Sequence, residues 1–179
     1  MTLVWIAIGL AAALAVWLGY FSLLSYLVRT SERQRQFETA DGLPQPPDGF
    51  YKGTAHLLGG GPVPWLGKSF VRTEELGFNI FTPAGASMLK VLTPLYKLFE
   101  VNADGTTRAF NFRTSRGTGL KDTAIQVIKL DYDSPENPFL IRIILDEIVQ
   151  TAPGEYLGKV HMKVFPGYFA TIGFFGLRK

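Results

Sequence analysis

The chain has 179 residues, a net charge of +3 and no cysteine. This length is enough for one domain and an appendage, and the lack of cysteine excludes disulfides and thiolate metal sites. The small positive charge does not indicate a nucleic-acid partner, and we expect none.

The first predicted element is an apolar helix. Residues 1–28 contain no Asp, Glu, His, Lys or Arg, and a helix needs about 20 apolar residues to cross a bilayer. We therefore predict a transmembrane helix over residues 1–28, with Trp5 and Tyr26 near the two membrane interfaces. A cleaved signal peptide is one alternative, but it requires a positive leader and an apolar core of only about 7–15 residues. A buried soluble helix is another, and it is disfavoured because the stretch is apolar on every face.

The charges that flank this helix predict its orientation. Arg29, Arg33 and Arg35 follow it closely, whereas no lysine or arginine precedes it. By the positive-inside rule, the C-terminal domain is expected on the cytoplasmic side of the membrane. The predicted location is a single-pass position in a bacterial inner membrane.

Two regions follow the helix. Residues 29–48 are interpreted as a linker that is charged at first and rich in proline at its end. Residues 49–179 form the predicted β-domain, in which turn signals separate apolar segments at roughly the spacing of a sandwich or barrel. Eight strands are expected, over residues 50–58, 65–72, 76–82, 107–114, 123–131, 139–150, 156–165 and 169–177.

Two segments of the predicted β-domain also show a helical pattern of apolar residues. Residues 84–102 carry apolar residues at spacings of three and four, which predicts an amphipathic helix bent or split at Pro94. Residues 139–150 also fit a helical stripe, but their β-branched residues and flanking turns favour a strand. The predicted fold is mainly β, an antiparallel up-and-down barrel of about eight strands with one helical insertion, preceded by the transmembrane helix. Closure removes exposed sheet edges, and a sandwich is the alternative.

Short motifs at the start of the domain resemble known families. "DGFYKG" resembles the Gly-x-Trp signature that opens a lipocalin, with Tyr51 in place of tryptophan, and Arg178 near the end of the last strand is also lipocalin-like. The same Gly-x-aromatic-x-Gly pattern followed by "PWLGKSF" is similar to an uncharacterised bacterial family named for a Gly-x-Trp-x-Gly motif. These resemblances imply a calycin-type barrel and, for lipocalins, a small apolar ligand in the cup. They imply no catalytic residues.

Arg142 and Asp146 are the leading candidates for a ligand site. On one strand they would share a face, and that face would either line a barrel interior or meet water, while Glu147 would lie on the opposite face. Ionised groups in an apolar cup must be paired, and such sites often orient a ligand head group. A solvent-facing strand is the structural alternative, and an acid–base role for Asp146 is a third reading. Tyr51 and Trp65 are the other predicted ligand-binding residues.

No catalytic, metal or cofactor site is predicted. His56 and His161 are the only two histidines, and they form no local metal motif, so each is expected to be a strand residue with a hydrogen-bonded ring. Asp131, Asp133 and Glu136 lie close together but lack the spacing of a calcium loop. We interpret them as part of a solvated hairpin.

The tripeptide Leu-Gly-Lys occurs twice, each time after an aromatic residue at the start of a predicted strand. We interpret Gly67 and Gly158 as points at which the strand bulges or bends. Lys68 and Lys159 are expected to point outward from the barrel.

The leading functional hypothesis is a non-enzymatic, membrane-anchored calycin-like domain that binds a hydrophobic small molecule, a lipid or an isoprenoid. Its expected partners are the lipid bilayer and that ligand. One alternative is an accessory or structural subunit of a larger membrane protein complex. A second alternative is a barrel enzyme acting on a lipid-like substrate, which requires Arg142 or Asp146 to point inward.

Overall fold

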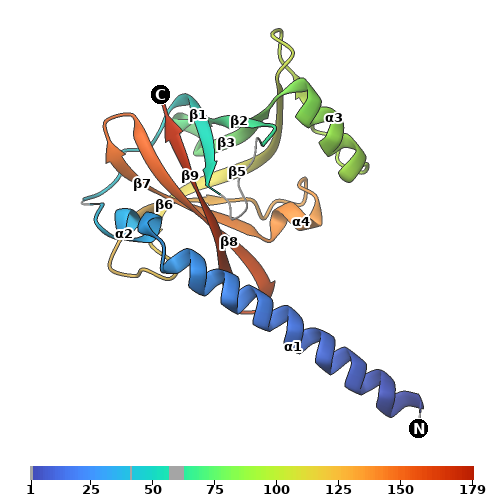
Figure 1. The fold of residues 1–179 in the computed structure, drawn as a ribbon. Helices are drawn as coiled ribbons and strands as arrows, with labels where there is room; N and C mark the ends of the chain where they lie inside the picture. Colours follow the sequence, from blue (N-terminus) through green and yellow to red (C-terminus); the bar gives the residue numbers. More distant parts are fainter. Residues whose placement is uncertain (1, 41, 57–62) are drawn as a thin grey trace.

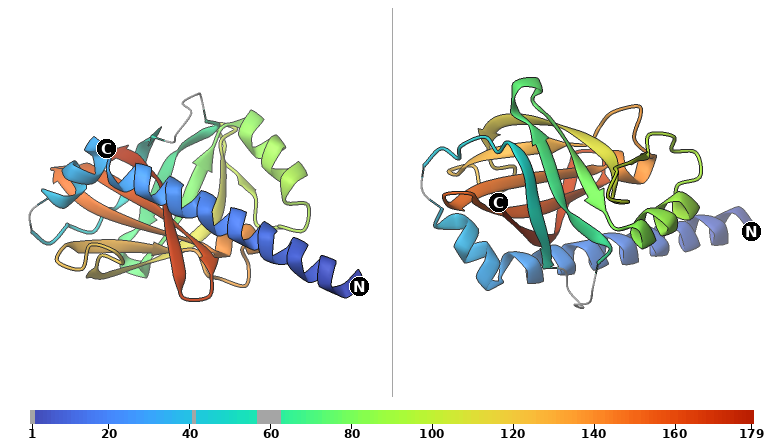
Figure 2. Two further views of the ribbon diagram at one scale, coloured as in Figure 1. Left: turned by 60° about the horizontal axis from the view of Figure 1, so that its bottom comes forward. Right: turned by 90° about the horizontal axis from the view of Figure 1, so that it is seen from above.

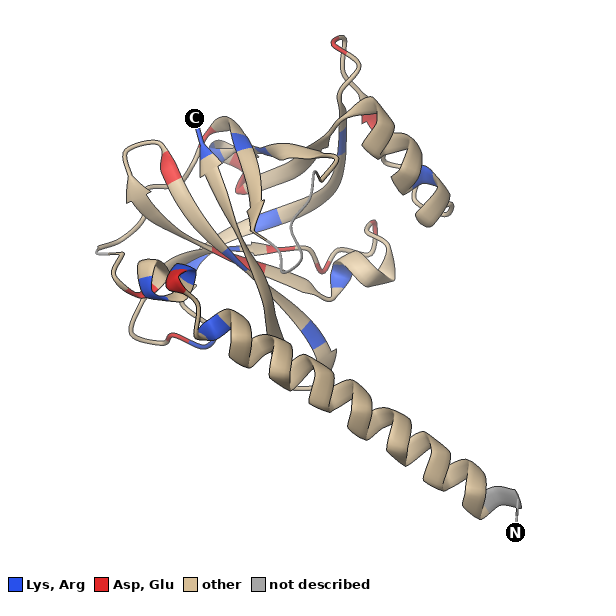
Figure 3. Cartoon of the chain, viewed as in Figure 1, with Lys and Arg blue, Asp and Glu red and all other residues tan. Residues whose placement is uncertain are grey.

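The computed structural model describes residues 2–40, 42–56 and 63–179. Its first element is the helix α1 (Thr2–Arg29), which is long and apolar enough to cross a membrane. Figure 3 shows no charged residue along α1 before Arg29. The side chains of residues 4–17 are exposed, whereas Phe21, Ser25 and Val28 are buried. The first part of α1 therefore projects beyond the domain, and its last turns pack on the domain (Figure 1).

Eight strands form a closed antiparallel barrel (Figures 1 and 2). They are β1 (Gly49–His56), β2 (Trp65–Val71), β3 (Leu76–Phe81), β5 (Thr107–Thr118), β6 (Gln126–Asp131), β7 (Ile144–Ala152), β8 (Glu155–Phe165) and β9 (Tyr168–Arg178). Each pairs with the next, and β9 pairs with β1 to close the barrel. A two-residue strand, β4 (Glu100–Val101), pairs with the start of β5. The predicted fold class is confirmed, the sandwich is excluded, and the barrel is consistent with a calycin-like fold.

Three short helices and a 3₁₀ turn connect the longer elements. They are α2 (Glu32–Glu38), α3 (Pro83–Leu92), α4 (Phe139–Arg142) and the 3₁₀ turn Arg72–Glu74. The start of α3 is capped by the Thr82 hydroxyl, which accepts a hydrogen bond from the Gly85 N–H at 3.1 Å. The helix stops before Pro94, so the predicted insertion is a ten-residue helix followed by an irregular segment.

Most strand boundaries lie within a few residues of the prediction, with two exceptions. The predicted end of the first strand, at Leu58, lies outside the described residues. Residues 139–150 are not one strand, because α4 occupies the first four positions and β7 begins at Ile144. Pro138 starts the helical turn, and the buried Asn137 amide fixes the preceding loop by donating to the carbonyls of Asn111 and Tyr132 at 2.7 and 2.9 Å.

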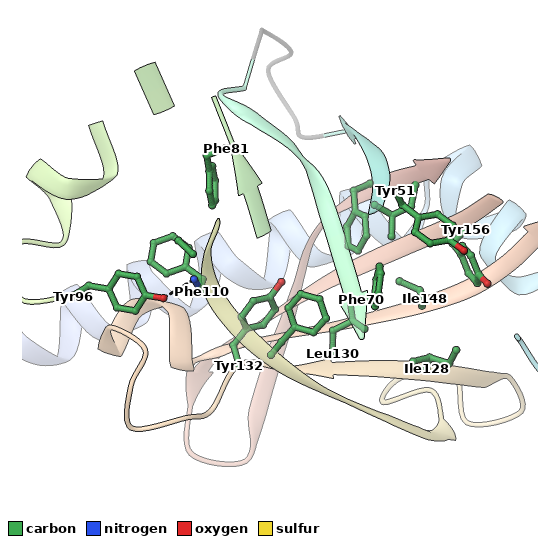
Figure 4. Packing of buried hydrophobic residues seen from close by; sticks show 14 residues of the cluster. Tyr51, Phe70, Phe81, Tyr96, Phe110, Ile128, Leu130, Tyr132, Ile148 and Tyr156 are labelled. Atoms are coloured by element: carbon green, nitrogen blue, oxygen red, sulfur yellow. Dashed lines mark hydrogen bonds between the residues drawn. The ribbon is translucent and has the colours of Figure 1, made fainter. Parts of the chain in front are cut away.

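Aromatic rings fill one end of the barrel. Tyr51 packs edge to face on Phe70 and Tyr156, with ring centroids 5.8 and 5.5 Å apart. Figure 4 shows these rings grouped at one end of the interior and Phe81 and Phe110 at the other. The second end lies on the side of α3 and α4 (Figure 1).

The segment between α1 and β1 packs on the outer wall of the barrel. Phe37 of α2 is fully buried there. Beside it, Asp122 forms ion pairs with Lys159 and, at 3.3 Å, with Arg29, and it accepts a hydrogen bond from Gln34 at 3.0 Å. We call Arg29, Gln34, Asp122 and Lys159 the outer polar cluster. It joins the end of α1 and the start of α2 to the barrel wall.

Candidate functional site

A β-bulge in β2 turns Lys68 into the barrel. The pairing of β2 with β3 shifts between Trp65 and Gly67, and Gly67 has a φ of +148°. A bulge adds one residue to a strand and so reverses the alternation of the side chains that follow it. Trp65, Lys68 and Phe70 consequently all pack in the interior. The bulge predicted at Gly67 is confirmed, and the expectation that Lys68 points outward is wrong.

Lys68 meets three polar side chains inside the barrel. Its Nζ lies 3.0 Å from Asp146 Oδ2, donates to Asn79 Oδ1 at 2.9 Å and donates to the Tyr132 hydroxyl. All three ammonium protons therefore have acceptors. We call Lys68, Asn79, Tyr132 and Asp146 the interior polar cluster. Its residues come from β2, β3, the end of β6 and β7.

Burial shifts the pKa values of two groups in this cluster. It lowers the pKa of Lys68, although the charge of Asp146 and its hydrogen bond act in the opposite direction. Burial also raises the pKa of Tyr132 well above its usual range, and the neighbouring carboxylate of Asp146 adds to that rise. The phenol is therefore neutral and remains a hydrogen-bond donor, and it lies 3.3 Å from Asp146 Oδ2.

Aromatic rings surround the buried ammonium. The Lys68 Nζ lies 5.0–5.5 Å from four ring centroids, those of Trp65, Phe112, Tyr132 and Phe175. A cation at this distance is attracted by the negative face of a ring. The buried ammonium of Lys68 is therefore stabilised by one carboxylate and by the faces of aromatic rings rather than by water.

The strained backbone of Phe110 lies beside the interior polar cluster. Phe110 has a φ of +55°, which is unusual for a bulky residue. The side-chain amide of Asn79 donates to the Phe110 carbonyl at 3.2 Å, and the Tyr96 hydroxyl accepts from the Phe110 N–H at 2.8 Å. These two hydrogen bonds hold Phe110 in a backbone conformation that costs of order 1–3 kcal/mol without such support. They therefore fix the part of the barrel wall to which Phe110 belongs.

A cavity of about 340 Å³ opens at the α3–α4 end of the barrel. Its wall is mainly apolar and includes Leu89 of α3, Ile141 of α4 and Val160 of β8, and the interior polar cluster contributes Lys68, Asn79, Tyr132 and Asp146. The Asp146 carboxylate is 4% exposed, and its Oδ1 accepts no hydrogen bond from the described residues. The walls that the cavity presents are therefore almost entirely apolar, and Asp146 Oδ1 itself has almost no exposed surface.

The four predicted ligand-binding residues lie in different places. Asp146 and Trp65 line the cavity, and the Trp65 indole N–H donates to the interior polar cluster at 3.1 Å. Tyr51 lies at the filled end of the barrel. Arg142 is exposed on α4 and pairs with Asp133 at 2.8 Å. The expectation that Arg142 shares a strand face with Asp146 is wrong, because the helix α4 places it outside the barrel.

The second Leu-Gly-Lys copy lies in a regular stretch of strand. Gly158 pairs with Ile148 and Phe175 without a shift of register, so it does not form a bulge like that at Gly67. Glycine is needed at this position because a Cβ would lie 2.1 Å from the Phe175 ring. Lys159 points outward as expected, but it is buried beneath Phe37, with its Nζ 3.8 Å from that ring centroid.

His161 lies on β8 with a hydrogen-bonded ring, as expected. Glu147 lies on the face opposite Asp146, and its Oε2 is 3.1 Å from the Nε2 of the buried His161. The other ring nitrogen of His161 lies 3.3 Å from the Thr171 hydroxyl. In the described part of the chain, no group of three or more His, Asp or Glu side chains could hold a metal ion.

Sequence reasoning missed Lys68, Asn79 and Tyr132. A signal was present for two of them, because each is a polar residue in a strongly apolar strand, "WLGKSF" and "GFNIF". A polar side chain inside a barrel needs a hydrogen-bond partner. If Lys68 and Asn79 are placed inside the barrel with Asp146, the three side chains can satisfy one another.

Comparisons of this chain with protein families, with curated proteins and with solved structures find no match. The resemblance to a Gly-x-Trp-x-Gly family is therefore unsupported by relatives, and the site is interpreted from its own geometry.

Proposed function

We propose that this protein is a membrane-anchored, calycin-like domain that binds one hydrophobic small molecule, a lipid or an isoprenoid, in the cavity at the α3–α4 end of the barrel. The observation that carries the proposal is a cavity with almost wholly apolar walls at the α3–α4 end of the barrel, bordered by the interior polar cluster. Most pockets for small molecules share this design of apolar walls and a few placed polar groups.

The size of the cavity limits the ligand. Its volume of about 340 Å³ is near the lower end of the usual range for ligand pockets. The filled end of the barrel, closed by Tyr51 and Tyr156, prevents a long chain from passing through. The cavity suits one apolar chain or a single isoprenoid group rather than a whole two-chain phospholipid.

The interior polar cluster limits the polar end of the ligand. Lys68 has no free proton, so it is not available to bind an anionic head group. The Oδ1 of Asp146 accepts no hydrogen bond from the described residues, but it has almost no exposed surface, so a ligand in the cavity does not reach it without movement of the wall. The cavity therefore suits a wholly apolar group, and a polar end of the ligand would lie toward the opening.

Native mass spectrometry of the full chain, purified from its membrane in mild detergent, tests the proposal. We expect one small molecule per chain in the wild type and none in Val160→Phe, which fills the cavity. The matched control is Val101→Phe, which adds the same volume at a residue that is 63% exposed on β4. A wild-type chain that carries no added mass, even after incubation with fatty alcohols and isoprenoid alcohols, would contradict the proposal.

A barrel enzyme acting on a lipid-like substrate is the second candidate, and one observation favours it. Asp146 points inward, its Oδ2 lies 3.3 Å from the hydroxyl of the neutral Tyr132 phenol, and both residues border the cavity, so a carboxylate and a proton donor lie beside one cavity. If the protein is an enzyme, the extracted molecule changes mass during incubation with wild-type protein and not with Asp146→Asn. An unchanged mass with both proteins supports binding alone.

We further propose that the barrel lies on the cytoplasmic side of a bacterial inner membrane. Arg33 and Arg35 are exposed on α2, just after the projecting helix, which is where the positive-inside rule expects cytoplasmic charges. In sealed inside-out vesicles, trypsin should cleave the domain without detergent. Protection of the domain from trypsin in those vesicles would show that it lies on the opposite side of the membrane.

A further inference from the structure

Outside α1, seven large apolar side chains of the described residues are more than half exposed, and six of them lie on three segments, the seventh being Val101 of β4. The six lie in α3 and the loop after it, in α4, and at the tip of the β8–β9 hairpin, and their exposed fractions range from 52% to 89%. We call this set the apolar rim: Val91, Leu92, Leu95, Phe139, Leu140 and Phe165. A soluble surface seldom carries so many large apolar groups close together, and such a patch marks an interaction site.

These three segments lie at the end of the barrel toward which α1 projects. All the views in Figures 1 and 2 place α3, α4 and the β8–β9 turn on the side of the N-terminus, with α2 on the opposite side. The burial of α1 changes near the same end: the helix is largely exposed up to Tyr20 and then buries Phe21 and Ser25 against the barrel. A bilayer that contains the exposed part of α1 therefore has its surface close to the apolar rim.

The helices of the apolar rim also form the wall of the cavity. Leu89 of α3 and Ile141 of α4 line the cavity, while their neighbours Val91 and Leu140 are 79% and 68% exposed. Each helix is thus apolar both toward the cavity and toward the outside. Only these short elements separate the cavity from the surface on which the rim lies.

The charges near the apolar rim suit a membrane surface. Lys90, Lys97 and Lys163 are exposed within or beside the rim segments, and such residues are attracted to anionic head groups. Of the nearby carboxylates, Asp133 is paired with Arg142 at 2.8 Å and Glu100 with Arg108 at 3.1 Å, while the exposed Asp131 and Glu136 offset part of the positive charge. Mixed apolar and basic side chains are typical of elements that lie in the interface of a bilayer.

We propose that the apolar rim inserts into the surface of the bilayer that α1 crosses, so that the barrel mouth rests on the membrane. The occupant of this surface is lipid, because the anchor already holds this end of the barrel beside the bilayer. If the cavity binds a lipid-derived molecule, as proposed above, the ligand enters it from the lipid phase through the opening of the cavity, whose lining includes Leu89 of α3 and Ile141 of α4. The membrane contact itself does not depend on any ligand.

Depth measurements with the full chain test the contact. The chain has no cysteine, so a nitrobenzoxadiazole label can be attached to Leu95→Cys, Leu140→Cys or Phe165→Cys alone. The controls are Leu43→Cys and Val101→Cys, which replace exposed apolar residues away from the rim segments. Each protein is reconstituted in vesicles of phosphatidylcholine and phosphatidylglycerol.

We expect the three rim labels to be quenched at least twofold more by lipids with a shallow doxyl group than the two control labels, and to be correspondingly protected from aqueous iodide. Rim labels that iodide quenches as strongly as the controls would overturn the proposal. Rim labels shielded from both quenchers would also overturn it, because a protein partner would then cover the rim. Leu95→Glu with Leu140→Glu should release the rim label at Phe165→Cys, while Val101→Glu should not.

Ligand content separates this inference from the proposed function. Rim labels in contact with lipid, on a chain that carries no small molecule, would leave the membrane contact standing and remove the binding proposal. A bound small molecule on a chain whose rim labels are exposed to iodide would leave the binding proposal standing and remove the membrane contact.

Discussion

The Nζ of Lys68 and the Oδ2 of Asp146 lie 3.0 Å apart across the interior of the barrel, and both side chains are only 4% exposed. The two strands that carry them are not neighbours in the sheet, since β2 and β7 are separated on both sides. The ion pair therefore ties opposite walls together beside the cavity.

Removal of one partner of this pair should be strongly destabilising. Asp146→Asn leaves the ammonium of Lys68 buried without its counter-charge, and we expect a loss of about 3–5 kcal/mol in the free energy of unfolding. The double variant Lys68→Met with Asp146→Leu should lose less than either single variant, because no buried charge remains. Urea unfolding of the full chain in detergent, followed by circular dichroism, measures both.

The control for the Lys68–Asp146 ion pair is an ion pair on the protein surface. Asp133→Ala breaks the exposed ion pair with Arg142, and such pairs contribute at most about 1 kcal/mol. If Asp146→Asn were no more destabilising than Asp133→Ala, the interior ion pair would have no structural role.

Gly67 should tolerate no side chain. Its φ of +148° is strained for other residues, and a Cβ would lie 2.0 Å from the carbonyl oxygen of Tyr51. We expect Gly67→Ala to cost at least about 2 kcal/mol of stability. Gly117→Ala on β5 is the control, because its Cβ would lie 3.5 Å from Lys129 at an ordinary φ, and a change within about 0.5 kcal/mol is expected. Equal melting temperatures for the two variants would refute the bulge.

The outer polar cluster should weaken in acid. Burial raises the pKa of Asp122, but the hydrogen bond and charge of Lys159, with the charge of Arg29, outweigh burial and hold that pKa below its ordinary value of 3.8. A carboxylate with a lowered folded pKa stabilises the fold above 3.8, and this contribution disappears as the pH falls through the folded pKa. The wild type should therefore be more stable than Asp122→Asn at pH 6, and the difference should shrink below pH 3.8.

Trypsin provides a second measurement of the same cluster. At neutral pH, Asp122→Asn should speed cleavage after Arg33 and Arg35, because α2 is held less firmly to the barrel. Asp133→Ala should leave the cleavage rate unchanged. A pH-independent stability difference between wild type and Asp122→Asn would show that the charge of Asp122 is not what holds α2.

The Tyr96 hydroxyl should support the cavity wall through the backbone. In Tyr96→Phe the N–H of Phe110 loses its acceptor, and an unsatisfied buried donor costs about 1–3 kcal/mol. Hydrogen exchange of the Phe110 amide should also become faster than in the wild type. Tyr20→Phe, at an exposed position on α1, is the control and should change neither property.

The eight strands were predictable because their signals are local. "AFNFRT" alternates along β5, and turns such as Asp104-Gly105 and Pro166-Gly167 carry the positive φ angles that a hairpin needs. The long apolar helix is likewise visible in composition alone. These features depend on neighbouring residues, so a single sequence contains them.

The orientation of the site residues was not predictable from local pattern. Lys68 faces inward only because a bulge forms at Gly67, and that bulge depends on close contact with the backbone of β1. Arg142 faces outward because Asn137 and Pro138 start a helical turn, and Asn137 does so by bonding the distant carbonyl of Asn111. Both outcomes rest on contacts between residues far apart in the chain.

The fluorescence of Trp65 gives the most direct test of a ligand cavity at the barrel mouth. The chain has three tryptophans, so Trp5→Phe with Trp17→Phe leaves Trp65 alone, beside the cavity. This protein in detergent is titrated with a brominated fatty alcohol. We predict quenching that saturates at one molecule per chain and no saturable phase when Val160→Phe is added. Quenching that rises without saturation, and equally in both proteins, would contradict the existence of a binding site there.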